Sequence, residues 1–123
     1  MSPGSTRADF AARLKAVPFF ARLAPDELAA LAREADWREY APGEAVFFEG
    51  EPAAGLFILD SGYVKVVKAS AQGREQSLEF IAPGQPFNTV AVFTSHPSPA
   101  TAVALEASAA WMLRATARRQ RAA

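Results

Sequence analysis

The sequence of 123 residues contains no cysteine and only one histidine, His96. The lack of cysteine excludes disulfides, thiolate zinc sites, cysteine-ligated iron–sulfur clusters and cysteine nucleophiles. The single imidazole excludes metal centres that need two or three histidines. The sequence also has no nucleophile-elbow motif and no glycine-rich phosphate loop. These absences argue against an enzyme.

The formal net charge at pH 7 is zero, and the sequence has no long apolar run. No stretch approaches the about 18 unbroken apolar residues of a membrane span, and no basic segment followed by an apolar one marks export. We therefore expect a soluble, cytoplasmic domain over residues 1–113, with no membrane partner. Residues 107–123 carry four arginines and no acid. We expect 114–123 to be a solvated basic tail, with contact to phosphate as the alternative.

Two amphipathic helices are predicted within about residues 6–35. Thr6 is placed to cap the first helix, and Pro18 ends its apolar stripe. The second helix begins near Pro25, which suits a first helical position. The predicted buried faces contain Phe10, Leu14 and Val17 in the first helix, and Leu28, Leu31, Ala32 and Ala35 in the second.

After Trp37, short apolar runs alternate with turn residues. Gly62, Gly73 and Gly84 lie 11 residues apart, which is typical of strand spacing in a sandwich or barrel. With the helices, this pattern predicts a mainly β fold, an antiparallel β-roll or double-stranded β-helix (jelly roll) of about eight strands. The predicted strands cover 45–48, 56–59, 63–68, 77–81, 100–105 and about 109–113. The predicted buried face of the roll contains Phe47, Leu56, Ile58, Val64, Val66, Leu78, Phe80 and Phe87.

Residues 83–93 interrupt this rhythm. The segment 83–86 predicts a rigid turn, and 87–93 is long enough for only one packed helical turn. The prolines within 95–99 predict a loop. An interruption of this kind inside a roll is a typical place for a ligand pocket.

Several spaced motifs, in this order, resemble one known family. They are 17–28 (VPFFARLAPDEL), 40–52 (YAPGEAVFFEGEP), 56–66 (LFILDSGYVKV), 73–75 (GRE) and 101–106 (TAVALE). This layout resembles the cyclic-nucleotide-binding domain, specifically the sensor half of the Crp/Fnr transcription regulators. The resemblance implies a regulatory sensor domain that binds a small-molecule effector and acts as a homodimer or with a partner protein.

The ligand motif departs from the family's pattern. In the family, a Phe-Gly-Glu segment is followed by an Arg and then a Ser or Thr; the Arg holds the cyclic phosphate and the Glu takes the ribose 2′-hydroxyl. Here Phe87 is retained, but Asn88 and Thr89 stand at the Gly and Glu positions. Ser98 and Pro99 stand at the Arg and Ser/Thr positions. Because no Arg or Lys lies between 75 and 113, we expect cyclic AMP and cyclic GMP to bind weakly or not at all.

The predicted pocket leaves several occupants open. An uncharged or apolar effector is one, and a pocket filled by its own side chains is another. Haem is a third, with His96 as its axial ligand, although a loop histidine is the simpler interpretation. The expected ligand-binding residues are Phe87, Asn88, Thr89, Val90, Ala91, Ser98, Pro99 and Ala100.

A non-catalytic protein-interaction module is the rival interpretation. Such a module would be solid at this place and would carry an exposed apolar patch, whereas a sensor should have an enclosed cavity bordered by 87–92 and 98–100. Family regulators also continue into a dimerisation helix and a helix-turn-helix. Residues 114–123 contain neither an apolar seam nor a recognition helix, so we expect no sequence-specific DNA binding by this chain alone.

Overall fold

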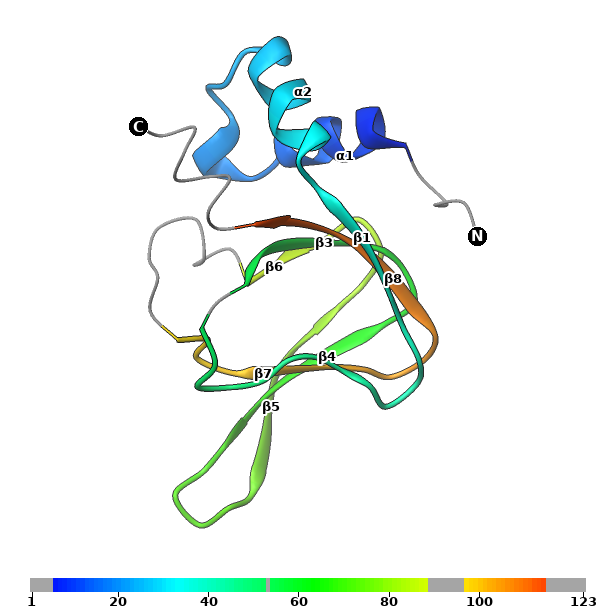
Figure 1. Cartoon of the computed structure of the whole chain (residues 1–123). Helices are drawn as coiled ribbons and strands as arrows, with labels where there is room; N and C mark the ends of the chain where they lie inside the picture. The colour runs from blue at the N-terminus through cyan, green and yellow to red at the C-terminus, as the bar shows by residue number, and fades with distance from the viewer. Residues whose placement is uncertain (1–5, 53, 89–96, 115–123) are drawn as a thin grey trace.

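The computed structural model describes residues 6–52, 54–88 and 97–114 (Figure 1). The predicted mainly β fold is confirmed. The helices are α1 (Arg7–Leu14), the 3₁₀ helix η1 (Pro18–Phe20) and α2 (Pro25–Arg33). The strands are β1 (Asp36–Tyr40), β2 (Ala45–Phe47), β3 (Gly55–Ser61), β4 (Val64–Ala69), β5 (Glu75–Ile81), β6 (Pro86–Phe87), β7 (Thr101–Ala104) and β8 (Ser108–Arg114).

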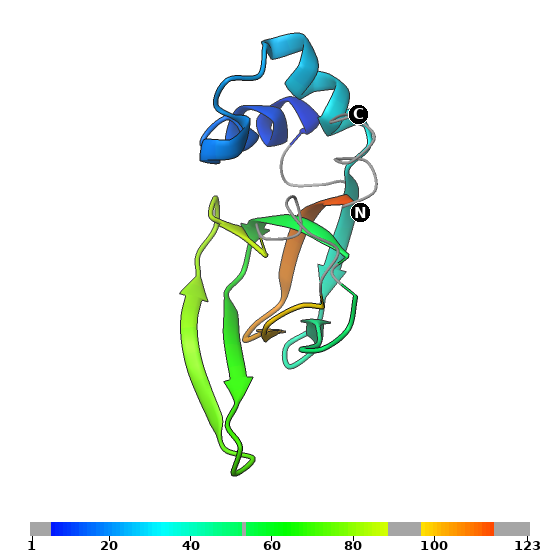
Figure 2. The same ribbon diagram turned by 90° about the vertical axis from the view of Figure 1, so that its left-hand side faces the viewer.

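The strands form two four-stranded antiparallel sheets. Their strand orders are β1-β8-β3-β6 and β2-β7-β4-β5. Successive strands such as β1 and β2, or β3 and β4, lie in different sheets, so the chain passes repeatedly between the sheets and closes a roll around an apolar interior. The helices cover the first sheet, and the β4–β5 hairpin reaches furthest from them (Figures 1 and 2).

Both helices begin where the sequence predicts. At α1, the Asp9 amide donates to Thr6 Oγ1 at 3.1 Å, and the Thr6 amide donates to Asp9 Oδ2 at 2.9 Å. This reciprocal pair satisfies amide groups that have no partner inside the helix. At α2, Pro25 takes the first helical position and Glu27 Oε1 accepts from the Ala24 amide at 2.9 Å.

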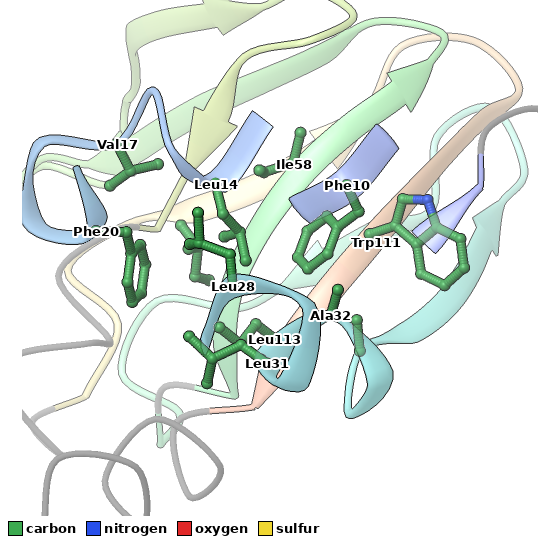
Figure 3. Close-up of a cluster of buried hydrophobic side chains, with 12 residues drawn as sticks. Phe10, Leu14, Val17, Phe20, Leu28, Leu31, Ala32, Ile58, Trp111 and Leu113 are labelled. Atoms are coloured by element: carbon green, nitrogen blue, oxygen red, sulfur yellow. The ribbon is translucent and has the colours of Figure 1, made fainter. Parts of the chain in front are cut away.

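The predicted helix faces pack on the outer side of the first sheet (Figure 3). Trp111 of β8 lies beneath α1, with its ring centroid 5.9 Å from that of Phe10. Leu56 and Ile58 of β3 join this cluster, whereas Phe57 and Leu59 point into the roll. The strand is therefore buried on both faces, and the predicted core residues Leu56 and Ile58 are buried under the helices instead of inside the roll.

The roll interior contains the other predicted core residues except two. Phe47, Val64, Val66 and Phe87 are buried there together with Phe57, Leu59, Ile81, Ala100, Ala102, Ala110 and Met112. The prediction for Leu78 and Phe80 is wrong, because their side chains are 51% and 48% exposed.

The error at Leu78 and Phe80 has a geometric cause. Val64 pairs with Ile81 and Val66 with Glu79, so the odd-numbered residues of β5 face inward at this end of the strand. Phe80 then lies on the outer face, where its ring stacks on that of Tyr63 with centroids 5.7 Å apart. The apolar alternation is present, but the register places Phe80 on the outer face and leaves Leu78 half exposed.

Two further elements differ from the prediction. Pro86–Phe87 is the short strand β6, paired with Phe57 and Ile58, so the expected turn ends earlier and Phe87 does not begin a helical turn. The rest of that predicted turn, 89–93, lies outside the described residues. Strand β1 has no strong apolar run and is held by its pairing with β8. Among the described helices, none has the length and apolarity to cross a membrane.

A candidate effector pocket

A pocket of about 300 Å³ lies between the inner face of the second sheet and the residues that directly follow β6 and precede β7. Strands β2, β4 and β5 form its walls, and the residues just after β6 and just before β7 complete it. Five of its eight lining residues are apolar. The lining consists of Phe47, Val66, Lys68, Leu78, Glu79, Asn88, Pro99 and Ala100.

Stacked aromatic rings support the apolar side of the pocket. The Phe57 and Phe87 centroids are 5.1 Å apart, and those of Phe47 and Phe57 are 5.6 Å apart. Phe47 lines the pocket, and Phe87, which is 2% exposed, packs behind it. Aromatic pairs at these distances pack favourably and hold each ring in place. Phe87 therefore shapes the pocket wall without lining the pocket.

Asn88 adopts the backbone conformation that a glycine usually supplies. Its φ is +57°, and among the described non-glycine residues it alone has a positive φ. Asparagine tolerates this left-handed region better than most residues. Its side-chain Nδ2 donates to the Gly55 carbonyl of β3 at 2.9 Å. Asn88 thus holds a backbone conformation that favours glycine and adds its side chain to the pocket lining.

Ser98, at the family's arginine position, is 2% exposed. Its amide donates to the Glu51 carbonyl at 2.8 Å, and its carbonyl accepts from the Gly50 amide at 2.9 Å. Among the described residues, its hydroxyl has no hydrogen-bond partner. The backbone at Ser98 therefore positions its neighbours Pro99 and Ala100, which line the pocket. The predicted residues Thr89, Val90, Ala91 and His96 lie outside the described residues.

Two charged lining residues are absent from the predicted set. Lys68 of β4 has its Nζ 3.4 Å from the Pro99 carbonyl oxygen, and Glu79 comes from β5. The sequence-based prediction considered cations between 75 and 113 and therefore missed Lys68, which comes from an earlier strand. The signal was available, since the period-2 pattern of β4 puts position 68 on the same face as Val64 and Val66.

A break in strand register brings Glu79 and Leu78 to the same pocket. Val66 pairs with Glu79 and Val67 with Ser77, so Leu78 has no partner on β4. An extra residue of this kind forms a β-bulge, which disturbs the alternation of side chains. Both Leu78 and Glu79 consequently line the pocket.

Arg114, the described arginine that follows the motif in sequence, is engaged elsewhere. Arg114 Nε donates to Asp36 Oδ2 at 2.7 Å, which ties β8 to β1 in the first sheet. Lys68 is thus the cation that the described residues bring to the pocket. Within that part of the chain, no three His, Cys, Asp or Glu side chains gather as a metal site would require.

Comparisons with known proteins agree with this fold. A family model described as the cyclic nucleotide-binding domain matches residues 37–121. The cyclic AMP receptor protein of Thermus thermophilus is 29% identical over 93 residues, which are 76% of this chain and 43% of that protein. The chain thus spans less than half the length of this curated relative.

Solved structures give the same picture. The sensor domain of the transcriptional regulator DNR from Pseudomonas aeruginosa is 27% identical, with a TM-score of 0.80 over 94% of this chain and 78% of that one. A regulatory subunit of a cAMP-independent protein kinase A from Trypanosoma cruzi, bound to guanosine, is 26% identical, with a TM-score of 0.74 over 89% of this chain and 39% of that one. From the family match, the antiparallel roll and these sensor-domain relatives, it follows that the chain belongs to the cyclic nucleotide-binding domain family, in the form found in Crp/Fnr-type regulators.

Proposed function

We propose that this chain is a regulatory, non-catalytic sensor domain whose pocket binds a small-molecule effector other than a cyclic nucleotide held in the family's mode. The observation that carries the proposal is the pocket itself, whose described lining is mainly apolar and includes no arginine. Ser98, the residue expected at the position of the phosphate-binding arginine, lies next to the lining residue Pro99. The family binds small-molecule effectors, and this pocket is the natural place for one.

The charges of the pocket argue against a cyclic phosphate. A guanidinium offers two parallel donors to a phosphate, and neither Ser98 nor Pro99 can supply them. Lys68 contributes one ammonium group, but Glu79 lines the same pocket and opposes an anion. Loss of a charge-assisted contact costs about 1.5–3 kcal/mol, which corresponds to about 10- to 100-fold in affinity.

The hollow favours an effector-binding role over a docking role. A protein-interaction module was expected to be solid at this place and to carry an exposed apolar patch. The space between Phe47, Leu78 and Ala100 is open, while Leu78 and Phe80, which are 51% and 48% exposed, supply the apolar surface that the rival interpretation expects. The related kinase regulatory subunit bound to guanosine supports the idea that this fold accepts a nucleoside without a phosphate. Haem has no comparable support, because His96 lies outside the described residues.

Isothermal titration calorimetry with cyclic AMP and cyclic GMP tests the negative half of the proposal. We expect no micromolar binding of either compound to the full chain. A micromolar dissociation constant for cyclic AMP would overturn this half, and Arg114→Gln would then report whether Arg114 is the missing cation.

A thermal-shift panel of nucleosides, nucleobases, small apolar compounds and haem tests the positive half. A ligand of the native state at 100 times its dissociation constant stabilises by about 2.7 kcal/mol. For a domain of this size, that corresponds to a rise in Tm of about 10 °C. If no compound stabilises the chain, or if the stabilising compound acts equally on a variant with the pocket blocked by Ala100→Phe, the sensor proposal fails.

A further inference from the structure

Lys68 and Glu79 bring opposite charges to one pocket without forming an ion pair. Within the described residues, Lys68 makes one side-chain hydrogen bond, in which its Nζ donates to the neutral Pro99 carbonyl at 3.4 Å. Glu79 has neither a hydrogen bond nor a salt bridge in that part of the chain. The contrast is Lys65 and Glu75 on the same two strands, whose Nζ and Oε1 atoms lie 2.6 Å apart.

The charge balance at the pocket is therefore zero. Lys68 attracts an anionic ligand but Glu79 repels it, and Glu79 attracts a cationic ligand but Lys68 repels it. A molecule without net charge avoids both penalties and can still use both groups. It would accept a hydrogen bond from the ammonium and donate one to the carboxylate, and both bonds are strengthened by the charge of the protein group.

The remaining walls favour a flat ring. Phe47, Val66 and Leu78 supply apolar surface, and the stacked phenylalanines behind Phe47 hold it rigid. The volume of about 300 Å³ is at the lower end of the usual range for ligand pockets. A single heterocycle with a small polar substituent fits this volume better than a dinucleotide or an extended lipid.

This inference rests on the proposed function. We propose that the effector is an uncharged nucleoside-like heterocycle. Lys68 and Glu79 select it, Lys68 as hydrogen-bond donor and Glu79 as hydrogen-bond acceptor. A guanine-type edge matches these roles, since its carbonyl oxygen is an acceptor beside two N–H donors. Selection then depends on the absence of charge on the ligand as much as on its shape. In this arrangement Glu79 discriminates against nucleotides.

Guanosine and cyclic GMP form the matched probe pair, because they share the base and the sugar and differ in the charged phosphate. Calorimetry on the full chain is expected to give a dissociation constant for guanosine at least about tenfold lower than that for cyclic GMP. Glu79→Gln should weaken guanosine by about tenfold and tighten cyclic GMP, which reverses the preference. Lys68→Gln should weaken both ligands.

Matched control variants are available on the outer face of the same strands. Lys65→Gln and Glu75→Gln each remove the same type of charge outside the pocket and should leave both dissociation constants unchanged. A reversal of preference in Glu79→Gln that is absent from Glu75→Gln would support the assignment. Far-ultraviolet circular dichroism on each variant ensures that a loss of binding is not a loss of folding.

Three results would overturn this inference. The first is equal or tighter binding of cyclic GMP by the unmodified chain. The second is no effect of Glu79→Gln on the preference, and the third is no binding of guanosine at millimolar concentration. If another compound of the thermal-shift panel binds in the pocket while guanosine does not, this inference fails and the proposed function stands. If nothing binds, the proposed function itself fails.

Discussion

Arg7 of α1 contacts both the C-terminal end of α2 and Trp111 of β8, and its replacement should weaken the packing of these three elements. Its Nη1 atom donates to the Ala32 carbonyl at 2.8 Å, to the Ala35 carbonyl at 2.6 Å and, at a longer 3.4 Å, to the Arg33 carbonyl. The Ala32 and Arg33 carbonyls belong to the last turn of α2, where carbonyl groups lack an amide partner inside the helix, and the Ala35 carbonyl follows the helix. The Ala32 carbonyl also accepts from the Ala35 amide at 3.1 Å. The guanidinium also lies over the Trp111 ring, 5.0 Å from its centroid.

The magnitude follows from these contacts. A cation at a helix C-terminus contributes about 0.3–1 kcal/mol, and a cation–π contact at an exposed site about 0.5–1 kcal/mol. The two short hydrogen bonds add about 1 kcal/mol, discounted because Arg7 is exposed to solvent. Arg7→Met should therefore lower the free energy of unfolding by about 2–3 kcal/mol and Tm by about 8–12 °C.

Urea unfolding followed by circular dichroism gives the free energy directly. Arg7→Lys keeps the charge but loses the planar fork, so about half of the loss should remain. Arg22→Met is the matched control, because Arg22 is an exposed arginine outside these contacts, and it should change stability by less than about 0.5 kcal/mol. If Arg7→Met is as stable as Arg22→Met, the assignment of Arg7 as a clasp between α1, α2 and β8 is refuted.

Two further predictions concern a turn and a helix cap. At Gly62, φ is +93° and an added Cβ would meet the Ser108 hydroxyl and the Ala107 carbonyl, whereas at Gly73, φ is +78° and the space is open. By thermal unfolding, Gly62→Ala should therefore cost about 1–3 kcal/mol more than Gly73→Ala, and equal losses would contradict the steric argument. At Asp9, the backbone hydrogen bond from Thr6 holds the carboxyl pKa below its ordinary value of 3.8. The stabilisation by the ionised carboxyl is thus complete above pH 3.8 and is lost as the pH falls through the lower pKa of the folded state. Asp9→Asn should therefore reduce the loss of stability on acidification, measured by thermal unfolding at a series of pH values. If the variant loses as much stability on acidification as the unmodified chain, the cap assignment is contradicted.

Local interactions account for what could be predicted from the sequence. The cap at Thr6, the start of α2 at Pro25 and the glycine turns each depend on a few neighbouring residues, and the structure has them where expected. The inward direction of Val64 and Val66 also follows from period-2 alternation alone. Such features need no knowledge of which strands pair.

What could not be predicted depends on pairing between distant segments. Phe80 and Leu78 have the spacing of a buried strand face, but β5 pairs with β4 in the register that buries Ile81 instead. Lys68 reaches the pocket through the fold and lies far from the motif in sequence. The site prediction was therefore partial. Of the predicted ligand-binding residues, Asn88, Pro99 and Ala100 line this pocket, and Lys68 and Glu79 line it without having been predicted; that this lining binds a ligand stays a prediction.

The unpaired residue at Leu78 has a consequence for solubility. Among the described strands, β5 lies at an edge of its sheet, and its residue Phe80 is exposed. A long, regular edge strand would offer unpaired backbone groups to a second copy of the chain and so favour aggregation. The extra residue breaks the row of backbone donors and acceptors, and the nearby carboxylates of Glu75 and Glu79 repel a second copy in register. The same irregularity that brings Leu78 to the pocket beside Glu79 therefore also protects the chain against stacking on itself.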